Sequence, residues 1–306
     1  MKCTRCRERA VVEVPRANAA FCSTCFTATY VPNLVTRAIR HDRMFATTDR
    51  ILVAVSGGKD SLALWHLLLE LGYSVDGLYL GLGIGGYSDR SHAVCQDFAD
   101  ARGAKLLTVD LAETAGFTIP EAAAAKRRPA CAVCGLSKRH YFNEVARDHG
   151  YDVVATGHNL DDEAAVLFGN VLRWETSYLA RQAPVLQATH PSLVKKVKPL
   201  YRVAERETAA YCVLTGIDYV VEECPLVEGN TQLKYKAVLD ELEAASPGTK
   251  HNFLFGFLEN AKQLFPPDGV ELHACVHCGA PTPGESCAFC NARRSLTAGP
   301  SGKATR

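Results

Sequence analysis

The chain of 306 residues carries 34 lysines and arginines against 33 aspartates and glutamates, and 47% of its residues are hydrophobic. This length and composition allow one main globular domain of about 200 to 250 residues with small appendages. The formal net charge of +1 excludes a uniformly basic nucleic-acid binder, so a nucleic-acid partner has to be argued from local clusters of charge.

No targeting or membrane-spanning segment is visible in the sequence. The first ten residues, MKCTRCRERA, lack the apolar core of a signal peptide, and no apolar stretch reaches the roughly 18 residues that a spanning helix needs. We therefore expect a cytosolic protein. In a reducing compartment its 13 cysteines favour metal binding over a disulfide framework.

Five Cys-x-x-Cys pairs account for ten of these cysteines. Two pairs lie in the first 30 residues, where a Cys-x2-Cys-x15-Cys-x2-Cys pattern is formed by Cys3, Cys6, Cys22 and Cys25. Four thiolates complete the tetrahedral shell of a structural metal ion and leave no open position for catalysis. We predict a zinc knuckle at residues 1–30.

A connecting helix is predicted within residues 31–49, and the pattern changes at Arg50. Up to about residue 225, apolar runs alternate with helical stretches. Strands are expected at 51–56, 74–82, 105–111 and 152–158, and helices at about 61–71, 91–102, 134–149 and 160–173. Repeated strand and helix units with short connections predict an α/β fold, in which a doubly wound parallel sheet is covered on both faces. We take residues 50–225 as the catalytic domain.

A glycine-rich block, SGGKDS, follows the first of these strands and precedes an apolar helix. Gly57 and Gly58 let backbone N–H groups approach an anion, Lys59 supplies a positive charge, and the helix N-terminus adds its dipole. The block is neither a Walker A loop nor a dinucleotide fingerprint. We predict a phosphate site, with a tight turn that merely caps the helix as the alternative.

This block resembles the PP-loop of the ATP pyrophosphatases, which cleave ATP to AMP and pyrophosphate. The resemblance implies a catalytic role for Asp60 and a Mg²⁺ ion that screens the leaving pyrophosphate. The later stretch GHNLDD matches the family pattern GHNxDD, in which Asp162 is favoured over Asp161 as acid or base; helix capping is their alternative role. The predicted nucleotide site comprises Ala54, Ser56, Gly57, Gly58, Lys59, Asp60, Ser61, Leu80 and Gly157.

The central pair, Cys131 and Cys134, has no second pair beside it. Cys224 follows a strand expected at 218–223 and precedes a proline, so it would lie at the sheet edge where ligands bind. Three cysteines on loops near one edge suit an iron–sulfur cluster with one iron left without a protein thiolate. The alternatives are a zinc ion completed by a histidine such as His140, and a redox-active disulfide.

The two remaining cysteines, Cys95 and Cys212, fall on the apolar sides of predicted helices and are expected in the core. Lys138, seven residues beyond Cys131, could bridge the cluster loop and the phosphates, and we predict a catalytic role for it.

Beyond the catalytic domain, residues 226–268 are predicted to form a helical extension that breaks near SPGTK. Residues 269–295 hold a second zinc knuckle, and residues 296–306 a disordered tail. The spacing of this knuckle is Cys-x2-Cys-x8-Cys-x2-Cys, formed by Cys275, Cys278, Cys287 and Cys290.

A PP-loop, a central Cys-x-x-Cys, a later Cys-Pro and cysteine modules at both ends resemble the TtuA branch of the TtcA/TtuA family of tRNA 2-thiolation enzymes. Stretches such as VKPLYRVAERE, ECPLVEGNT and SPGTKHNFLFGF extend the resemblance over almost the whole chain. It implies that Cys131, Cys134 and Cys224 bind a [4Fe–4S] cluster whose free iron takes up sulfide. It also implies a ubiquitin-like sulfur carrier with a C-terminal thiocarboxylate, and a homodimer.

The expected reaction is adenylation of the C2 carbonyl oxygen of a tRNA uridine, followed by its replacement with sulfur. Three local basic clusters favour a structured RNA, bound through its phosphates with the target base flipped out. These clusters are Lys126, Arg127 and Arg128, then Lys195, Lys196 and Lys198, then Lys234, Lys236, Arg293 and Arg294.

Several alternatives stay open at this point. The T-loop uridine is favoured, but close relatives modify the wobble uridine, and the TtcA branch, which lacks the terminal knuckles, modifies an anticodon-loop cytidine. A PP-loop ligase that forms amides or lysidine would give the central cysteines no task. A non-enzymatic zinc-ribbon protein that binds RNA would not need an intact SGGKDS block.

Overall fold

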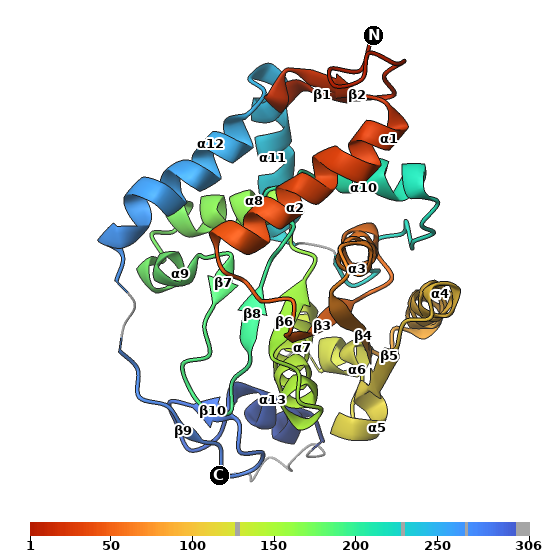
Figure 1. Ribbon diagram of the computed structural model, residues 1–306. Helices are drawn as coiled ribbons and strands as arrows, with labels where there is room; N and C mark the ends of the chain where they lie inside the picture. The colour runs from red at the N-terminus through yellow and green to blue at the C-terminus, as the bar shows by residue number, and fades with distance from the viewer. Residues whose placement is uncertain (126–128, 228–229, 267–268, 298–306) are drawn as a thin grey trace, which may run out of the picture.

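The computed structural model describes residues 1–125, 129–227, 230–266 and 269–297. At its centre lies a six-stranded sheet in the order β5-β4-β3-β6-β8-β7 (Figure 1). Every neighbouring pair is parallel except β7 and β8, which run antiparallel. The strands are β3 (Arg50–Val55), β4 (Ser74–Gly81), β5 (Leu106–Asp110), β6 (Val153–Thr156), β7 (Val185–Leu186) and β8 (Lys195–Val197).

Helices cover both faces of this sheet because its strands are apolar on both sides. On one face, Ile51 and Val53 of β3 pack with α3, α4, α8 and α10; on the other, Leu52 packs with residues of α7. These helices are α3 (Lys59–Glu70), α4 (Gly85–Arg102), α7 (Ala130–Asp148), α8 (Leu160–Leu172) and α10 (Glu205–Thr215). The predicted doubly wound, mostly parallel sheet is confirmed.

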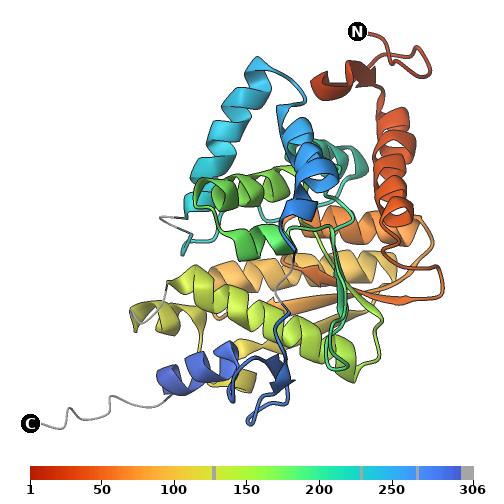
Figure 2. The same cartoon turned by 90° about the vertical axis from the view of Figure 1, so that its left-hand side faces the viewer.

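The two ends of the chain form small modules at opposite ends of the molecule (Figure 1). The first has a hairpin of β1 (Val12–Val14) and β2 (Ala19–Phe21) around η1 (Pro15–Ala17). It continues through α1 (Ser23–Cys25) and η2 (Phe26–Tyr30) into α2 (Val31–His41). The last module contains β9 (His273–Ala274), β10 (Pro281–Thr282) and α13 (Ala288–Thr297), and α13 lies along α7 (Figure 2).

The helical extension breaks where proline and glycine predict it. It consists of α11 (Thr231–Ala245), α12 (Thr249–Gly256), η3 (Phe257–Ala261) and η4 (Lys262–Leu264). Both α11 and α12 pack on α8, above the sheet in Figure 2. The shorter helices of the central domain are α5 (Leu111–Ala115), α6 (Ile119–Ala124) and α9 (Thr176–Arg181).

Three expectations differ from the structure. The strand expected at 218–223 is wrong, because this segment is irregular and the N–H of Val220 donates to the carbonyl of Gly57 at 2.8 Å. Helix α7 begins at Ala130, so Cys131 and Cys134 lie in its first turns and not on a loop. Helix α13 runs to Thr297, past the expected start of disorder, while residues 298–306 lie outside the described part. No helix of the described residues is long and apolar enough to cross a membrane.

Candidate functional site

A cavity of about 720 Å³ lies at the carboxyl ends of β3, β4 and β6, and we call it the sheet-end pocket. Ala54 of β3, Leu80 of β4 and Thr156 of β6 line it. Ligands of open α/β sheets bind at this edge, because loops from successive strands meet there. The predicted glycine-rich loop, the GHNLDD segment and the central cysteines all contribute side chains to this one cavity.

Close packing of glycines shapes the loop after β3. Gly57 has a φ of 75°, and a Cβ there would lie 2.8 Å from the carbonyl oxygen of Ser91, so only glycine fits. A Cβ on Gly157 would lie 2.8 Å from the backbone nitrogen of Ser61. Gly58 is the N-cap residue of α3, and at this position no side chain of the described residues accepts a hydrogen bond from the first N–H groups of the helix. The first N–H groups of α3 can therefore donate to an anion.

Asp60 and Lys59 lie next to each other in the chain but serve different cavities. Asp60 lines the sheet-end pocket and accepts hydrogen bonds from Asn159 Nδ2 at 3.1 Å and from the Thr208 hydroxyl. Burial raises the pKa of Asp60, and the ammonium of Lys59, 3.1 Å away, opposes that rise.

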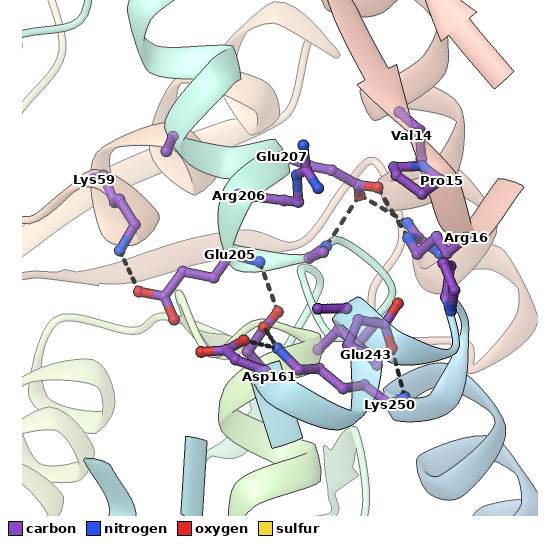
Figure 3. A pocket seen from close by; sticks show the side chains of 16 residues that line it. Val14, Pro15, Arg16, Lys59, Asp161, Glu205, Arg206, Glu207, Glu243 and Lys250 are labelled. Carbon is purple, nitrogen blue, oxygen red and sulfur yellow. Dashed lines mark hydrogen bonds and ion pairs between the residues drawn. The ribbon is translucent and has the colours of Figure 1, made fainter. Parts of the chain in front are cut away.

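Lys59 is not among the residues that line the sheet-end pocket. Its ammonium contacts Glu205 Oε1 at 2.7 Å. Lys59 thereby lines a second cavity of about 580 Å³, which we call the ionic pocket (Figure 3). Sequence alone could not show this direction, because Glu205 is 146 residues away in the chain.

The two aspartates of GHNLDD separate in the structure. Asp162 lines the sheet-end pocket, whereas Asp161 is buried, lines the ionic pocket and pairs with Lys250. Asp162 also completes a capping box at the start of α8, since its carboxylate accepts the N–H of Asn159 at 3.1 Å. Lys236 of α11 contacts the other oxygen of Asp162 at 2.6 Å. Asp162 therefore both caps helix α8 and lines the sheet-end pocket, so the two roles considered for it do not exclude each other.

The three central cysteines converge on the sheet-end pocket although Cys224 is distant in sequence. Cys131 is exposed, and Cys134 and Cys224 are partly buried in one apolar cluster. Burial raises the pKa of Cys134, and the nearby ammonium of Lys138 lowers it again. Lys138 lies one helical turn after Cys134 and lines the same pocket, as does Arg139.

Spacing distinguishes these three thiols from a site for a single metal ion. Zinc thiolates lie about 3.8 Å apart, because each zinc–sulfur bond is ~2.3 Å long and the angles are tetrahedral. Among the described residues, which include Cys131, Cys134 and Cys224, only the two terminal groups bring three or more possible metal ligands within 4.8 Å of one another. In this structure the three central thiols therefore do not form the compact set that a single tetrahedral ion needs.

His140 does not face this pocket. Its ring stacks on Phe289 of the C-terminal module with the centroids 4.0 Å apart. Burial lowers the pKa of His140 to about 4, so the imidazole is neutral near pH 7. The stacked position of His140 keeps it from completing a central zinc site, whereas His158 does line the pocket with the three thiols. Cys95 and Cys212, expected in the core, are fully buried.

Each terminal module brings its four thiols together as predicted. Cys6 and Cys22 have their sulfur atoms 3.5 Å apart, and Cys278 and Cys287 have theirs 3.7 Å apart. Backbone N–H groups, first that of Cys6, lower the pKa of Cys3 to about 6, whereas the pKa values of Cys6 and Cys25 are raised, Cys25 mainly by burial. Each group can therefore hold a tetrahedral ion.

The N-terminal module is also tied to the central domain by a bidentate ion pair. Arg16 of η1 donates to both carboxylate oxygens of Glu207 on α10, at 2.9 and 2.7 Å, and to the carbonyl of Arg202 at 3.1 Å. Such a fork fixes both distance and direction. These residues border the ionic pocket (Figure 3).

Most of the basic residues that suggested RNA contacts have internal partners. Lys198 pairs with Glu163 at 2.7 Å, and Lys196 donates to the Asn143 amide oxygen at 3.3 Å. Arg293 donates to a backbone carbonyl of α5. Lys234 is exposed, and residues 126–128 lie outside the described part. The sheet-end pocket instead presents Lys138 and Arg139 as its cations.

Comparison with known proteins gives matches over almost the whole chain. A family model described as the N-terminal LIM domain of 2-thiouridine synthetase TtuA matches residues 2–27, and a PP-loop domain model matches residues 33–236. A tRNA-5-methyluridine(54) 2-sulfurtransferase of Thermus thermophilus is 50% identical, with 95% of this chain and 90% of the relative covered. One from Pyrococcus horikoshii is 44% identical, with 95% and 93% covered.

A solved structure is similar as well. It is the U34-tRNA thiolase NcsA from Methanococcus maripaludis with its [4Fe-4S] cluster, at a TM-score of 0.83 and 25% identity. The match covers 97% of this chain and 96% of that one.

Proposed function

The chain belongs to the TtuA family of 2-thiouridine synthetases, and we propose that it replaces the C2 oxygen of 5-methyluridine 54 in tRNA with sulfur. It is a tRNA 2-sulfurtransferase by its similarity to the Thermus and Pyrococcus enzymes over at least nine tenths of their lengths. Those relatives are named for position 54, in the T-loop, whereas NcsA is named for U34. Their higher identity favours the T-loop uridine.

One observation carries the mechanism: a single cavity holds both the carboxylates of the PP-loop region and the three central thiols. Activation of the uridine and delivery of sulfur must occur at the same carbon, so both sets of groups have to reach one base. A ligase for amides or lysidine would not need the thiols, and an RNA-binding module would not need the pocket.

In the first step, the uridine O2 attacks the α-phosphorus of ATP while the bond to the leaving pyrophosphate breaks. We assign Asp162 to accept the proton from uridine N3, which makes O2 a better nucleophile. The N–H groups at the start of α3, with Ser56 and Ser61, would hold the phosphates, while Mg²⁺ would screen their charge. Lys138, on the cysteine side of the pocket, would stabilise charge on the adenylate.

In the second step, sulfide forms a bond to C2 and AMP leaves with the former carbonyl oxygen. When bound by Cys131, Cys134 and Cys224, a [4Fe–4S] cluster with one iron free of protein thiolate supplies a site that holds sulfide. The proposal is supported by the three thiols that line one pocket without forming one of the compact groups found at the two termini. Zinc is proposed for the two four-cysteine groups, whose compact sulfur atoms suit it.

Two protein partners are also proposed. A ubiquitin-like carrier with a C-terminal thiocarboxylate would supply the sulfur; this rests on the family resemblance.

A second copy of the chain would cover an apolar surface at the end of α8, where Leu172, Trp174 and Tyr178 are 56%, 71% and 57% exposed. Trp174 has a φ of 52° because α8 ends there, with the N–H of Glu175 donating to the carbonyl of Asn170 at 3.0 Å. Replacement Trp174→Ser should convert a dimer into a monomer in light scattering.

The function is tested with anaerobically purified, cluster-containing protein. Incubation with ATP, Mg²⁺, a sulfide source and unmodified tRNA should release pyrophosphate and add sulfur, and nuclease digestion with mass spectrometry should place 2-thiouridine at position 54. Sulfur at position 34 would replace the T-loop assignment with the wobble one. A colourless protein that releases no pyrophosphate with tRNA would overturn the proposal.

A further inference from the structure

Two carboxylates that line the sheet-end pocket each have a lysine behind them. Lys59 contacts Asp60 at 3.1 Å, and Lys236 contacts Asp162 at 2.6 Å. Neither lysine lines that pocket. Their ammonium groups therefore act on whatever binds there through the two aspartates, not by direct contact.

A third carboxylate, Glu205, joins the two lysines. Its Oε1 contacts Lys59 at 2.7 Å and its Oε2 contacts Lys236 at 2.8 Å. The side chains of Lys59, Glu205 and Lys236 are 23%, 35% and 21% exposed, so water screens them only in part. Figure 3 shows Glu205 reaching from α10 to Lys59.

Asn159 closes the arrangement into a ring. Its amide Nδ2 donates to Asp60 Oδ1 at 3.1 Å, and its backbone N–H donates to Asp162 Oδ2 at 3.1 Å. We call the five charged members, Asp60, Lys59, Glu205, Lys236 and Asp162, the ion network. They come from the start of α3, the start of α8, α10 and α11.

Opposite charges alternate along the network, and each lysine lies between two carboxylates. Burial would raise the pKa of Glu205, but Lys236 and Lys59 together bring it down to about 2. The carboxylates in turn raise the pKa values of both lysines against the effect of burial. Two contacts fix each lysine, so each can hold its aspartate in one orientation.

We propose that Glu205 and Lys236 are positioning residues for the adenylation step, because they hold the carboxylates of Asp60 and Asp162 toward the bound nucleotide and uridine. Lys236 also ties α11 to this site, and α11 starts seven residues after the cluster cysteine Cys224. The ion network thus links the segment that carries Cys224 to the nucleotide site. This inference rests on the proposed function.

The test compares Lys236→Met and Glu205→Gln in cluster-containing enzyme, with pyrophosphate release measured across pH. The charged groups that interact with Asp162 are Lys236, Asp60 and His158. Loss of the Lys236 charge should make Asp162 easier to protonate and move the acid limb to higher pH by about half a unit or more. Loss of the Glu205 charge should move the acid limb to lower pH, because Lys236 would then pair with Asp162 alone.

Both variants should also lower kcat, by about tenfold to a hundredfold, since small displacements of reacting groups are costly. Glu241→Gln is the matched control, because Glu241 is exposed on the same helix and was not assigned to the nucleotide site or to RNA; its rate and profile should equal those of the wild type. Cluster absorption and Tm of all variants are recorded. The proposal would be overturned if the acid limbs of the two pH profiles did not move, or if both moved in the same direction.

If Lys236→Met fails to fold, Glu205→Gln decides alone, because it keeps the shape of the side chain. A shift of its acid limb to lower pH supports the proposal, and an unchanged limb contradicts it. Wild-type enzyme without tRNA-dependent pyrophosphate release would instead refute the proposed function, so the two failures are distinguishable.

Discussion

In each terminal module four thiols lie within 4.8 Å of one another, whereas the three central thiols form no such compact group and share their pocket with Asp60 and Asp162. A complete tetrahedral shell leaves no position for a reactant and serves the fold. Three thiols beside two carboxylates do not complete such a shell, and they leave a position where a reactant can bind. Under the proposed function, cysteine serves structure at the ends of the chain and chemistry at its centre, and the number and spacing of the thiols distinguish the two roles.

The sharpest way to break this comparison is Cys224→Ala. Removal of one of three cluster thiolates should abolish the visible absorption of the iron–sulfur cluster and reduce thiolation to the level of a control without enzyme. Both zinc equivalents should remain. Iron and zinc analysis, visible spectra and tRNA mass spectrometry measure these outcomes.

Cys95→Ala is the control for iron content in that experiment, because Cys95 is fully buried, does not line the pocket and interacts with the backbone of Gly57 instead. It should lose stability and keep its iron. A Cys224→Ala protein that retained its cluster would show that a different residue supplies the third ligand.

The converse change is Cys278→Ala in the C-terminal module. It should lower the zinc content from two equivalents to one, and lower Tm by about 5 °C or more, because a structural metal contributes several kcal/mol. Cluster absorption of the protein that remains folded should persist. Loss of the cluster in parallel with the zinc would mean that the C-terminal module orders α7, on which it packs, and that the two kinds of site are not independent.

The smallest effect is expected for His140→Phe, which tests the contact between α7, the helix that carries Cys131 and Cys134, and the C-terminal module. His140 lies on α7 near the cluster cysteines but stacks on Phe289, and its imidazole is neutral because burial lowers its pKa to about 4. A phenyl ring should preserve the stack and change the free energy of unfolding by less than about 1.5 kcal/mol. Iron content and thiolation should stay at wild-type levels, and His149→Phe, at the exposed end of the same helix, is the control.

Local patterns determined much of this protein. Strands β3 to β6 and their helices follow from apolar runs of the right length, and the terminal cysteine groups follow from pair spacing, because neighbours in sequence set both. The convergence of Cys224 with Cys131 could also be inferred, since the carboxyl ends of parallel strands share an edge, although the strand assumed to carry Cys224 does not form.

Only the tertiary structure decided which way the charged side chains point. The Lys59 side chain points away from the sheet-end pocket and contacts Glu205. Asp161 and Asp162 line different cavities. Lys236, predicted as an RNA contact, pairs with Asp162 instead. Glu205 lies in the stretch VKPLYRVAERE, but neither that stretch nor the sequence around Lys236 reveals their partners, because helices distant in the chain contribute them. The direction of an ionised side chain depends on the nearest opposite charge in space, and that is fixed only when the helices have packed.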